Sequence, residues 1–304
     1  MTRLLFGRGA RGAIIQHIQE TLTAAGFDTK GHDGVYGGDT TTALIAFQKS
    51  HGLPETGSVD DATWVKLMSG PIPPVLDRCL GLTSTFEGHG FTLAQGNFDG
   101  AGVTWGIIGF TLKHGELKKI IKSAFAEDPA LVRSCFADKT DELLAILEKP
   151  LDKQIAWADS ISIPPSKAPL QEPWKGAFEK FGNTPLAQRL QLERVRDAYY
   201  TPALATAKKF GLKTEVGTAL CFDIHVQNGG IKNAAENVVR SKMTADMPES
   251  DVRVLIANAV ADNALPQWRE DVRMRKVAIA KGEGTVHGLK AELKNWGLDE
   301  FDVG

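Results

Sequence analysis

The chain has 304 residues, of which 42% are hydrophobic and 24% are charged. This composition excludes wholesale disorder and fibrous repeats, and the length suits one large domain or a small domain followed by a medium one. The formal net charge of -2 gives no overall basic field, so we expect no nucleic-acid partner, and no stretch has the length and apolarity of a membrane span. The three cysteines form no CxxC pair, which predicts reduced thiols, no metal site and no other cofactor.

The first 70 residues have the pattern of three short helices in a compact bundle. Gly26 and Gly52 are expected to end the first two helices. The apolar positions at helical spacing are Ile14, Ile18, Leu22 and Ala25, then Ala43, Leu44 and Phe47, then Trp64, Leu67 and Met68. The candidate caps are Asp39 or Thr40 for the second helix, and Ser58 and Asp60 for the third.

A proline cluster divides the chain. Because proline restricts the backbone to extended conformations, residues 71–75 are predicted to form a stiff linker between a domain at 1–70 and one at 76–304.

In the second domain a helix is expected to end at Glu87, and the glycine-rich stretch 91–110 is expected to form a small antiparallel β element. Further helices are predicted over 116–126, 140–160, 185–210, 214–228, 232–243, 250–264 and 267–281, with a proline-rich surface loop from Ile163 to Pro173. The expected fold class is mainly α with a small β element.

The N-terminal segment carries a characteristic series of residues. These are Gly9, Ile18-Gln19, Leu22, Gly26-Phe27, Asp33-Gly34-Val35-Tyr36-Gly37, Thr40, Ala43, Phe47-Gln48, Gly52-Leu53, Gly57, Val59, Thr63-Trp64 and Leu67. Over residues 3–68 the series resembles the three-helix peptidoglycan-binding domain of cell-wall hydrolases. The resemblance implies that this module binds bacterial peptidoglycan, with Asp33 and Tyr36 as candidate contacts.

Glu87 and Asp99 are candidates for a pair of catalytic carboxylates. At the end of a helix Glu87 would face the negative end of the helix dipole, which raises the pKa of a carboxyl group as a general acid requires. A helix that ends in glutamate, a β element with an aspartate and a helical body are the layout of lysozyme-like glycosidases, in which two carboxylates flank the scissile bond. From these residues alone, a solvated glutamate and an Asp99-Gly100 hairpin turn remain open as alternatives.

Two segments, Thr83–Glu87 and Asp99–Thr111, resemble the catalytic region of the family-46 chitosanases, which are inverting enzymes of the lysozyme superfamily. The resemblance implies Glu87 as general acid, Asp99 as general base and Thr104 as the residue that holds the attacking water.

The same resemblance implies a network that supports the acid. Asp223 would be its carboxylate, with Arg269 and Arg275 as partners and Arg253 as a weaker candidate; a structural ion pair between packed helices is the alternative. Trp105 is a candidate sugar contact, for which a core role is equally open.

The sequence also departs from the chitosanase pattern. Only eleven residues separate Glu87 from Asp99, fewer than is usual in that family. Gln227-Asn228-Gly229 stands where chitosanases tend to carry a His-Gly pair. The substrate contacts of the family are therefore not transferred to this chain.

We predict a modular peptidoglycan hydrolase of the bacteriophage endolysin type, a muramidase-like enzyme that cleaves β-1,4 bonds between N-acetylated amino sugars. An inverting mechanism predicts that the two carboxyl groups lie roughly 6.5–9.5 Å apart. The alternatives are a chitosanase, which should need an acidic cleft, a lytic transglycosylase, which does not need Asp99, and a non-catalytic wall-binding protein, which need not retain the catalytic residues.

The N-terminus has no apolar run of signal-peptide length. We therefore expect synthesis in the cytoplasm and action on the wall as a monomer. A holin-type partner would release an endolysin, whereas an antibacterial effector would be injected.

Overall fold

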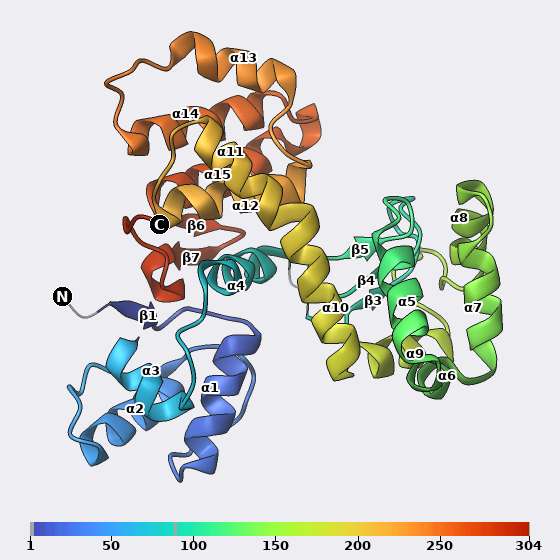
Figure 1. The fold of residues 1–304 in the computed structure, drawn as a ribbon, viewed down its shortest axis with the longest axis horizontal. Coiled ribbons are helices and arrows are strands. Elements are labelled where there is room, and N and C mark those ends of the chain that lie inside the picture. The colour runs from blue at the N-terminus through green and yellow to red at the C-terminus, as the bar shows by residue number, and fades with distance from the viewer. Residues whose placement is uncertain (1–2, 88–89, 304) are drawn as a thin grey trace. The chain divides into compact units, whose positions relative to one another are not determined.

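In the computed structural model, which describes residues 3–87 and 90–303, the chain is mainly helical with short strands (Figure 1). This confirms the predicted fold class. The chain divides into two compact units, one formed by Met1–Phe86 together with Tyr199–Gly304 and the other by Glu87–Ala198. Among the described residues, no helix is both long enough and apolar enough to cross a membrane.

The first unit begins with the predicted bundle of three helices. These are α1 (Ala13–Ala24), α2 (Gly38–Ser50) and α3 (Asp61–Met68), and the strands β1 (Leu4–Phe6) and β2 (Val59–Asp60) pair beside them. The Phe6 and Trp64 rings lie 5.7 Å apart in the core. The bundle is therefore closed by a two-stranded ribbon that the sequence pattern did not predict.

Two details of the bundle differ from the prediction. In α1 the buried position is Ile15 rather than Ile14, and Ala25 is exposed, so the core face is shifted by one residue. Helix α2 has no side-chain cap, because its N-cap residue is Gly37; the predicted caps Asp39 and Thr40 both lie inside the helix, where the buried Thr40 hydroxyl accepts a hydrogen bond from Gln19. The predicted cap of α3 is confirmed in the case of Asp60, whose carboxylate accepts the Thr63 N–H at 2.7 Å.

The rest of the first unit is a helical lobe built around one buried helix. Ten consecutive residues of α12 (Glu215–Asn228), from Glu215 to Ile224, are buried. The helices of this lobe are α4 (Val75–Glu87), α11 (Thr201–Lys209), α12, α13 (Asn233–Lys242), α14 (Glu249–Asp262) and α15 (Arg269–Lys281). Helix α12 contacts α11, α14 and α15, which explains why apolar and even charged residues are buried on it, among them Glu215 and Asp223.

A β-hairpin of this lobe was not predicted. Strands β6 (Glu283–Val286) and β7 (Leu289–Glu292) pair across a two-residue turn. His287 and Gly288, the turn residues, both have positive φ, as a type I′ turn requires. The usual sequence signal for such a turn is Asn-Gly, and here a histidine stands in place of the asparagine. The sequence therefore gave no clear indication of this hairpin.

Within the first unit, the bundle packs directly against the helical lobe. The Gly7 N–H donates to the Asn295 carbonyl at 3.1 Å, and the Asn295 amide donates to the Arg8 carbonyl at 3.0 Å. Arg3 from the bundle and Arg78 from α4 both pair with the buried carboxylate of Glu215. Residues before the proline-rich segment at 71–75 are therefore in direct contact with residues that follow it in the chain.

The second unit surrounds a small antiparallel sheet with helices. The sheet has the order β3 (Ala94–Gln95), β4 (Thr104–Trp105) and β5 (Phe110–Thr111), which agrees with the predicted β element. The helices are α5 (Glu116–Glu127), α6 (Pro129–Phe136), α7 (Thr140–Leu147), α8 (Leu151–Ser160), α9 (Trp174–Gly182) and α10 (Pro185–Val195). The aromatic core beneath the sheet consists of Trp105, Phe136, Phe178 and Phe181.

The helix predictions for this unit were incomplete. The single helix predicted over 140–160 is two helices, because Pro150 cannot continue α7 and instead precedes α8. Helices α6 and α9 were missed, although Asp128-Pro129 is a typical helix start: the Asp128 carboxylate accepts the Leu131 N–H at 2.8 Å.

Candidate active site

Helix α4 ends at Glu87, as the sequence predicted. The side chain of Glu87 lies outside the described part of the structure, so its distance to Asp99 stays a prediction. The preceding turn is tied to the lobe, because the Thr83 hydroxyl donates to the Asp223 carboxylate at 3.0 Å and Arg275 lies over the Phe86 ring at 5.2 Å. The end of α4 is therefore held by the buried charges of the first unit.

Asp223 is the centre of those charges. It is fully buried on α12, and its carboxylate accepts hydrogen bonds from Arg275 Nη2 at 2.6 Å and from Lys276 Nζ at 2.5 Å. Burial alone would raise the pKa of Asp223, but the positive charges of Arg275 and Lys276 outweigh burial and hold the pKa well below its ordinary value. Asp223 is therefore a permanent anion that balances two buried cations.

The membership of this network differs from the prediction. Arg275 contacts Asp223 as expected, and the neighbouring Lys276 was missed because a lysine gives no signal of burial in sequence. Nε of Arg269 is buried and has no hydrogen-bond partner among the described residues. Arg253 belongs to a different cluster, in which it pairs with Glu300 at 2.6 Å.

Asp99 lies on the turn between β3 and β4 in the second unit. Its side chain is exposed, and Oδ1 accepts the Ala101 N–H at 2.9 Å. Because Asp99 is exposed, water can approach its carboxylate. The Asp99-Gly100 sequence thus forms a turn, and the same turn presents a carboxylate at the surface.

Thr104 and Trp105 are consecutive residues of β4 and have different environments. Thr104 is 6% exposed, and its hydroxyl is buried without a hydrogen-bond partner among the described residues. Trp105 is fully buried, donates from Nε1 to the Phe178 carbonyl at 3.0 Å and stacks on Phe181. The structure therefore favours the core role of Trp105 over a sugar contact. The Thr104 hydroxyl, in contrast, can still form a hydrogen bond with a group outside the described residues.

The two candidate wall contacts of the bundle are also placed differently. Asp33 lines a pocket of 160 Å³ together with Gln19, Lys30 and Asp39. The hydrogen bond from Gln19 lowers the pKa of Asp33, so the pocket carries a carboxylate at neutral pH. Tyr36 is 1% exposed, and its hydroxyl donates to the Gly57 carbonyl, so its side chain supports the fold from inside.

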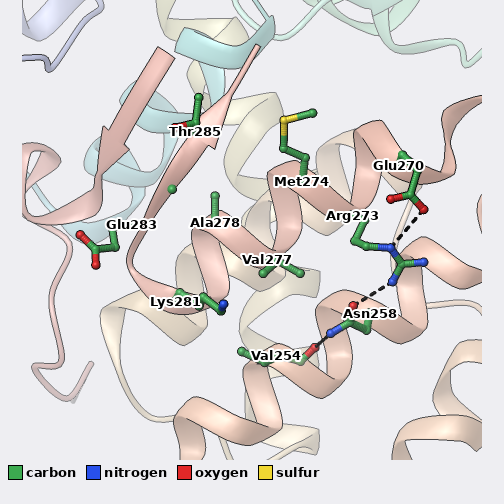
Figure 2. Close-up of a pocket in the computed structure, with 11 residues that line it drawn as sticks. Val254, Asn258, Glu270, Arg273, Met274, Val277, Ala278, Lys281, Glu283 and Thr285 are labelled. Carbon is green, nitrogen blue, oxygen red and sulfur yellow. Dashed lines mark hydrogen bonds and ion pairs between the residues drawn. The ribbon is translucent and has the colours of Figure 1, made fainter. Parts of the chain in front are cut away.

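A larger groove of 640 Å³ lies elsewhere in the first unit, between α14, α15 and β6 (Figure 2). Arg273 crosses it and pairs with Glu270 and Asn258, while Val254 and Val277 form part of its apolar wall (Figure 2). The predicted site residues are not among those that line this groove.

Comparisons with known proteins bear on both parts of the chain. The model of the putative peptidoglycan binding domain matches residues 11–67, and that of glycosyl hydrolase family 46 matches residues 83–252. The native chitosanase from Bacillus subtilis MY002 is 18% identical, with 70% of this chain and 88% of that chain covered and a TM-score of 0.51. A mutant chitosanase from the same source, complexed with 6 GlcN, is 18% identical over 74% of this chain and 98% of that chain, with a TM-score of 0.52.

The endolysin of Burkholderia AP3 phage is 19% identical, with 72% of this chain and 97% of that chain covered. Its TM-score is 0.21, at which the match carries no structural argument. The two chitosanase matches show a shared fold.

Proposed function

The chain belongs to glycosyl hydrolase family 46, and from this premise we propose that it hydrolyses the β-1,4 bonds between the N-acetylated amino sugars of bacterial peptidoglycan. The observation that carries the proposal is the peptidoglycan-binding domain at residues 11–67 of the same chain. A binding module concentrates an enzyme on the polymer that it recognises, since linked sites have a high effective concentration for one another. The enzyme would accordingly serve the lysis of bacterial walls.

The proposed mechanism is a single displacement. Glu87 donates its proton to the glycosidic oxygen, and Asp99 removes a proton from the water that attacks the anomeric carbon from the opposite face. The anomeric configuration is thereby inverted, and the proton balance is kept because one carboxyl group loses the proton that the other gains. The exposure of Asp99 supports its role, since a general base must reach a water molecule.

The environment of Thr104 supports a further role in this step. A buried hydroxyl without a partner is disfavoured, and such groups are rare in folded proteins. A water molecule that accepts from this hydroxyl, or donates to it, would complete its bonding. We assign Thr104 the orientation of the attacking water.

Chitosan is the second candidate substrate, because the solved structures with the same fold are described as chitosanases. The two polymers differ in charge: chitosan is a polycation, whereas the glycan strands of peptidoglycan are N-acetylated. The module at the N-terminus favours peptidoglycan, and the experiment below includes both polymers.

The test is mass spectrometry of the fragments that the wild type, Glu87→Gln and Asp99→Asn release from purified peptidoglycan and from chitosan. We expect fragments with reducing ends from peptidoglycan, lost in both variants. The matched control is Asp138→Asn, which changes an exposed aspartate of the same unit and should keep full activity. Anhydro ends that persist in Asp99→Asn would indicate a transglycosylase, and release from chitosan alone would refute the peptidoglycan substrate.

A further inference from the structure

The turn that carries Asp99 is held by one buried side chain, Asn97. Asn97 is 7% exposed, and both polar groups of its side chain have a partner within the second unit. Its carbonyl oxygen accepts the Gly102 N–H at 2.7 Å, and its amide nitrogen donates to Asp159 Oδ1 at 2.9 Å. Its backbone N–H donates to the Ser162 hydroxyl at 2.9 Å. Asn97 therefore joins both ends of the turn to the C-terminal end of α8 and to the residues that follow it.

That segment is itself fixed. Lys167 Nζ lies 2.6 Å from the Asp159 carboxylate, and its hydrogen bond, with that of Asn97, lowers the pKa of Asp159. The Ser162 hydroxyl donates to the Ala158 carbonyl at 2.6 Å. The Gly96 N–H donates to the Ala168 carbonyl at 2.7 Å. Asn97 is thus bound to an anchor that has its own hydrogen bonds.

The turn needs such a support because its backbone is permissive. Gly100 and Gly102 have φ values of 80° and 82°, which glycine adopts freely, so the backbone that follows Asp99 leaves the position of its carboxylate loosely specified. The single described side-chain bond of Asp99 is the local one to Ala101. The location of the carboxylate is therefore set by whatever fixes the two ends of the turn.

We propose that Asn97 is a positioning residue for the Asp99 carboxylate, acting through its amide bridge between Gly102 and Asp159. This inference rests on the proposed role of Asp99 as general base. Asparagine suits the position because one side chain supplies both an acceptor and a donor. Alanine supplies neither, and aspartate would place a second carboxylate against Asp159.

The first experiment measures kcat and KM on soluble, N-acetylated glycan strands prepared from peptidoglycan. Because a displacement of about 1 Å can lower a rate about a hundredfold, we expect Asn97→Ala to lower kcat on the order of 10- to 100-fold while KM changes less than about twofold. The matched control is Gln154→Ala, which removes an equally buried amide with two hydrogen bonds from α8. It should reduce the denaturant midpoint as much as Asn97→Ala does, with kcat unchanged.

The second experiment exchanges the two bridging side chains. Asn97→Asp sets two carboxylates against each other and should lower kcat more than Asp159→Asn does, because Asp159→Asn keeps an acceptor for the Asn97 amide and loses only the charge that faces Lys167. In the Asn97→Asp/Asp159→Asn double variant an amide again faces a carboxylate, and the Gly102 N–H keeps an acceptor. We expect kcat to return to within about threefold of the wild type, since the bridge is restored.

Two outcomes would overturn the inference: wild-type kcat in Asn97→Ala, or a double variant as slow as Asn97→Asp. Asp99→Asn, assayed on the same strands, separates this failure from that of the proposed function. If Asp99→Asn is inactive and Asn97→Ala is not impaired, the inference about Asn97 alone fails. If Asp99→Asn keeps full kcat, the proposed base is wrong and the inference falls with it.

Discussion

Thr104→Val replaces the hydroxyl of a buried threonine with a methyl group of nearly the same size. The Thr104 hydroxyl is buried and has no hydrogen-bond partner among the described residues. Leaving such a group unpaired costs about 1–3 kcal/mol, so removal of the hydroxyl should raise the free energy of unfolding by about 1 kcal/mol if no water completes its bonding in the resting enzyme. The same change removes the group to which we assign the orientation of the attacking water.

We therefore expect stability and activity to move in opposite directions. In Thr104→Val the kcat on soluble glycan strands should fall about tenfold to a hundredfold, because the water is no longer held in line. The assays are urea unfolding followed by circular dichroism and initial rates of reducing-end release. The reasoning would be refuted by a variant that loses more than about 1 kcal/mol of stability and keeps its kcat, since that is the behaviour of a structural hydroxyl.

Thr140→Val is the matched control for this prediction. Thr140 is as buried as Thr104, and its hydroxyl donates to the Ala137 carbonyl at 2.9 Å. Its replacement leaves that carbonyl without its partner, so the free energy of unfolding should fall by about 1 kcal/mol. The kcat should not change, because Thr140 lies at the start of α7, outside the proposed site.

The further predictions concern Asp223 and the bundle, both in the first unit. Asp223→Asn removes the buried carboxylate that pairs with Arg275 and Lys276, so urea unfolding should show a loss of about 3–5 kcal/mol. Because the folded-state pKa of Asp223 is depressed, its contribution to stability is complete above the unfolded pKa of about 4 and is lost as the pH falls below it, which unfolding across pH 2–6 can measure; a loss that begins on the alkaline side would contradict this assignment. In the bundle, Asp33→Asn should weaken sedimentation with purified peptidoglycan and leave hydrolysis of soluble strands intact, whereas Tyr36→Phe should cost about 1 kcal/mol of stability and leave sedimentation unchanged. Equal sedimentation of Asp33→Asn and wild type would remove Asp33 from the wall-binding site.

Most of the helical pattern was predictable because it is local. Apolar residues at helical spacing predicted helices that correspond to α5, α12, α13, α14 and α15 within one or two residues. The errors occurred at single residues that interrupt a helical pattern or form a turn of unusual sequence. Pro150 divided a predicted helix, and the turn at His287-Gly288 used a residue that rarely signals a hairpin.

The candidate catalytic residues were found from short motifs, because Asp99 and Thr104 stand at fixed spacing within one β element. Their environments were not predictable. Sequence left the core role and the sugar role of Trp105 equally open, and only its burial favours the core. The missing partner of the Thr104 hydroxyl is likewise a property of what surrounds it in space.

The sequence by itself indicated a peptidoglycan-binding domain and a domain of glycosyl hydrolase family 46, the helical class and the residues that resemble a glycosidase site. All of these depend on the spacing of residues along the chain. Only the tertiary structure decided which polar residues far apart in the chain pair with one another. Asp223 and Lys276 are 53 residues apart in sequence, and Asn97 and Asp159 are 62 residues apart. No local pattern records such a pair, since each residue alone reads as an ordinary polar side chain. Their partnership is decided by the packing of helices and turns, which leaves a buried charge or amide no other group to bond.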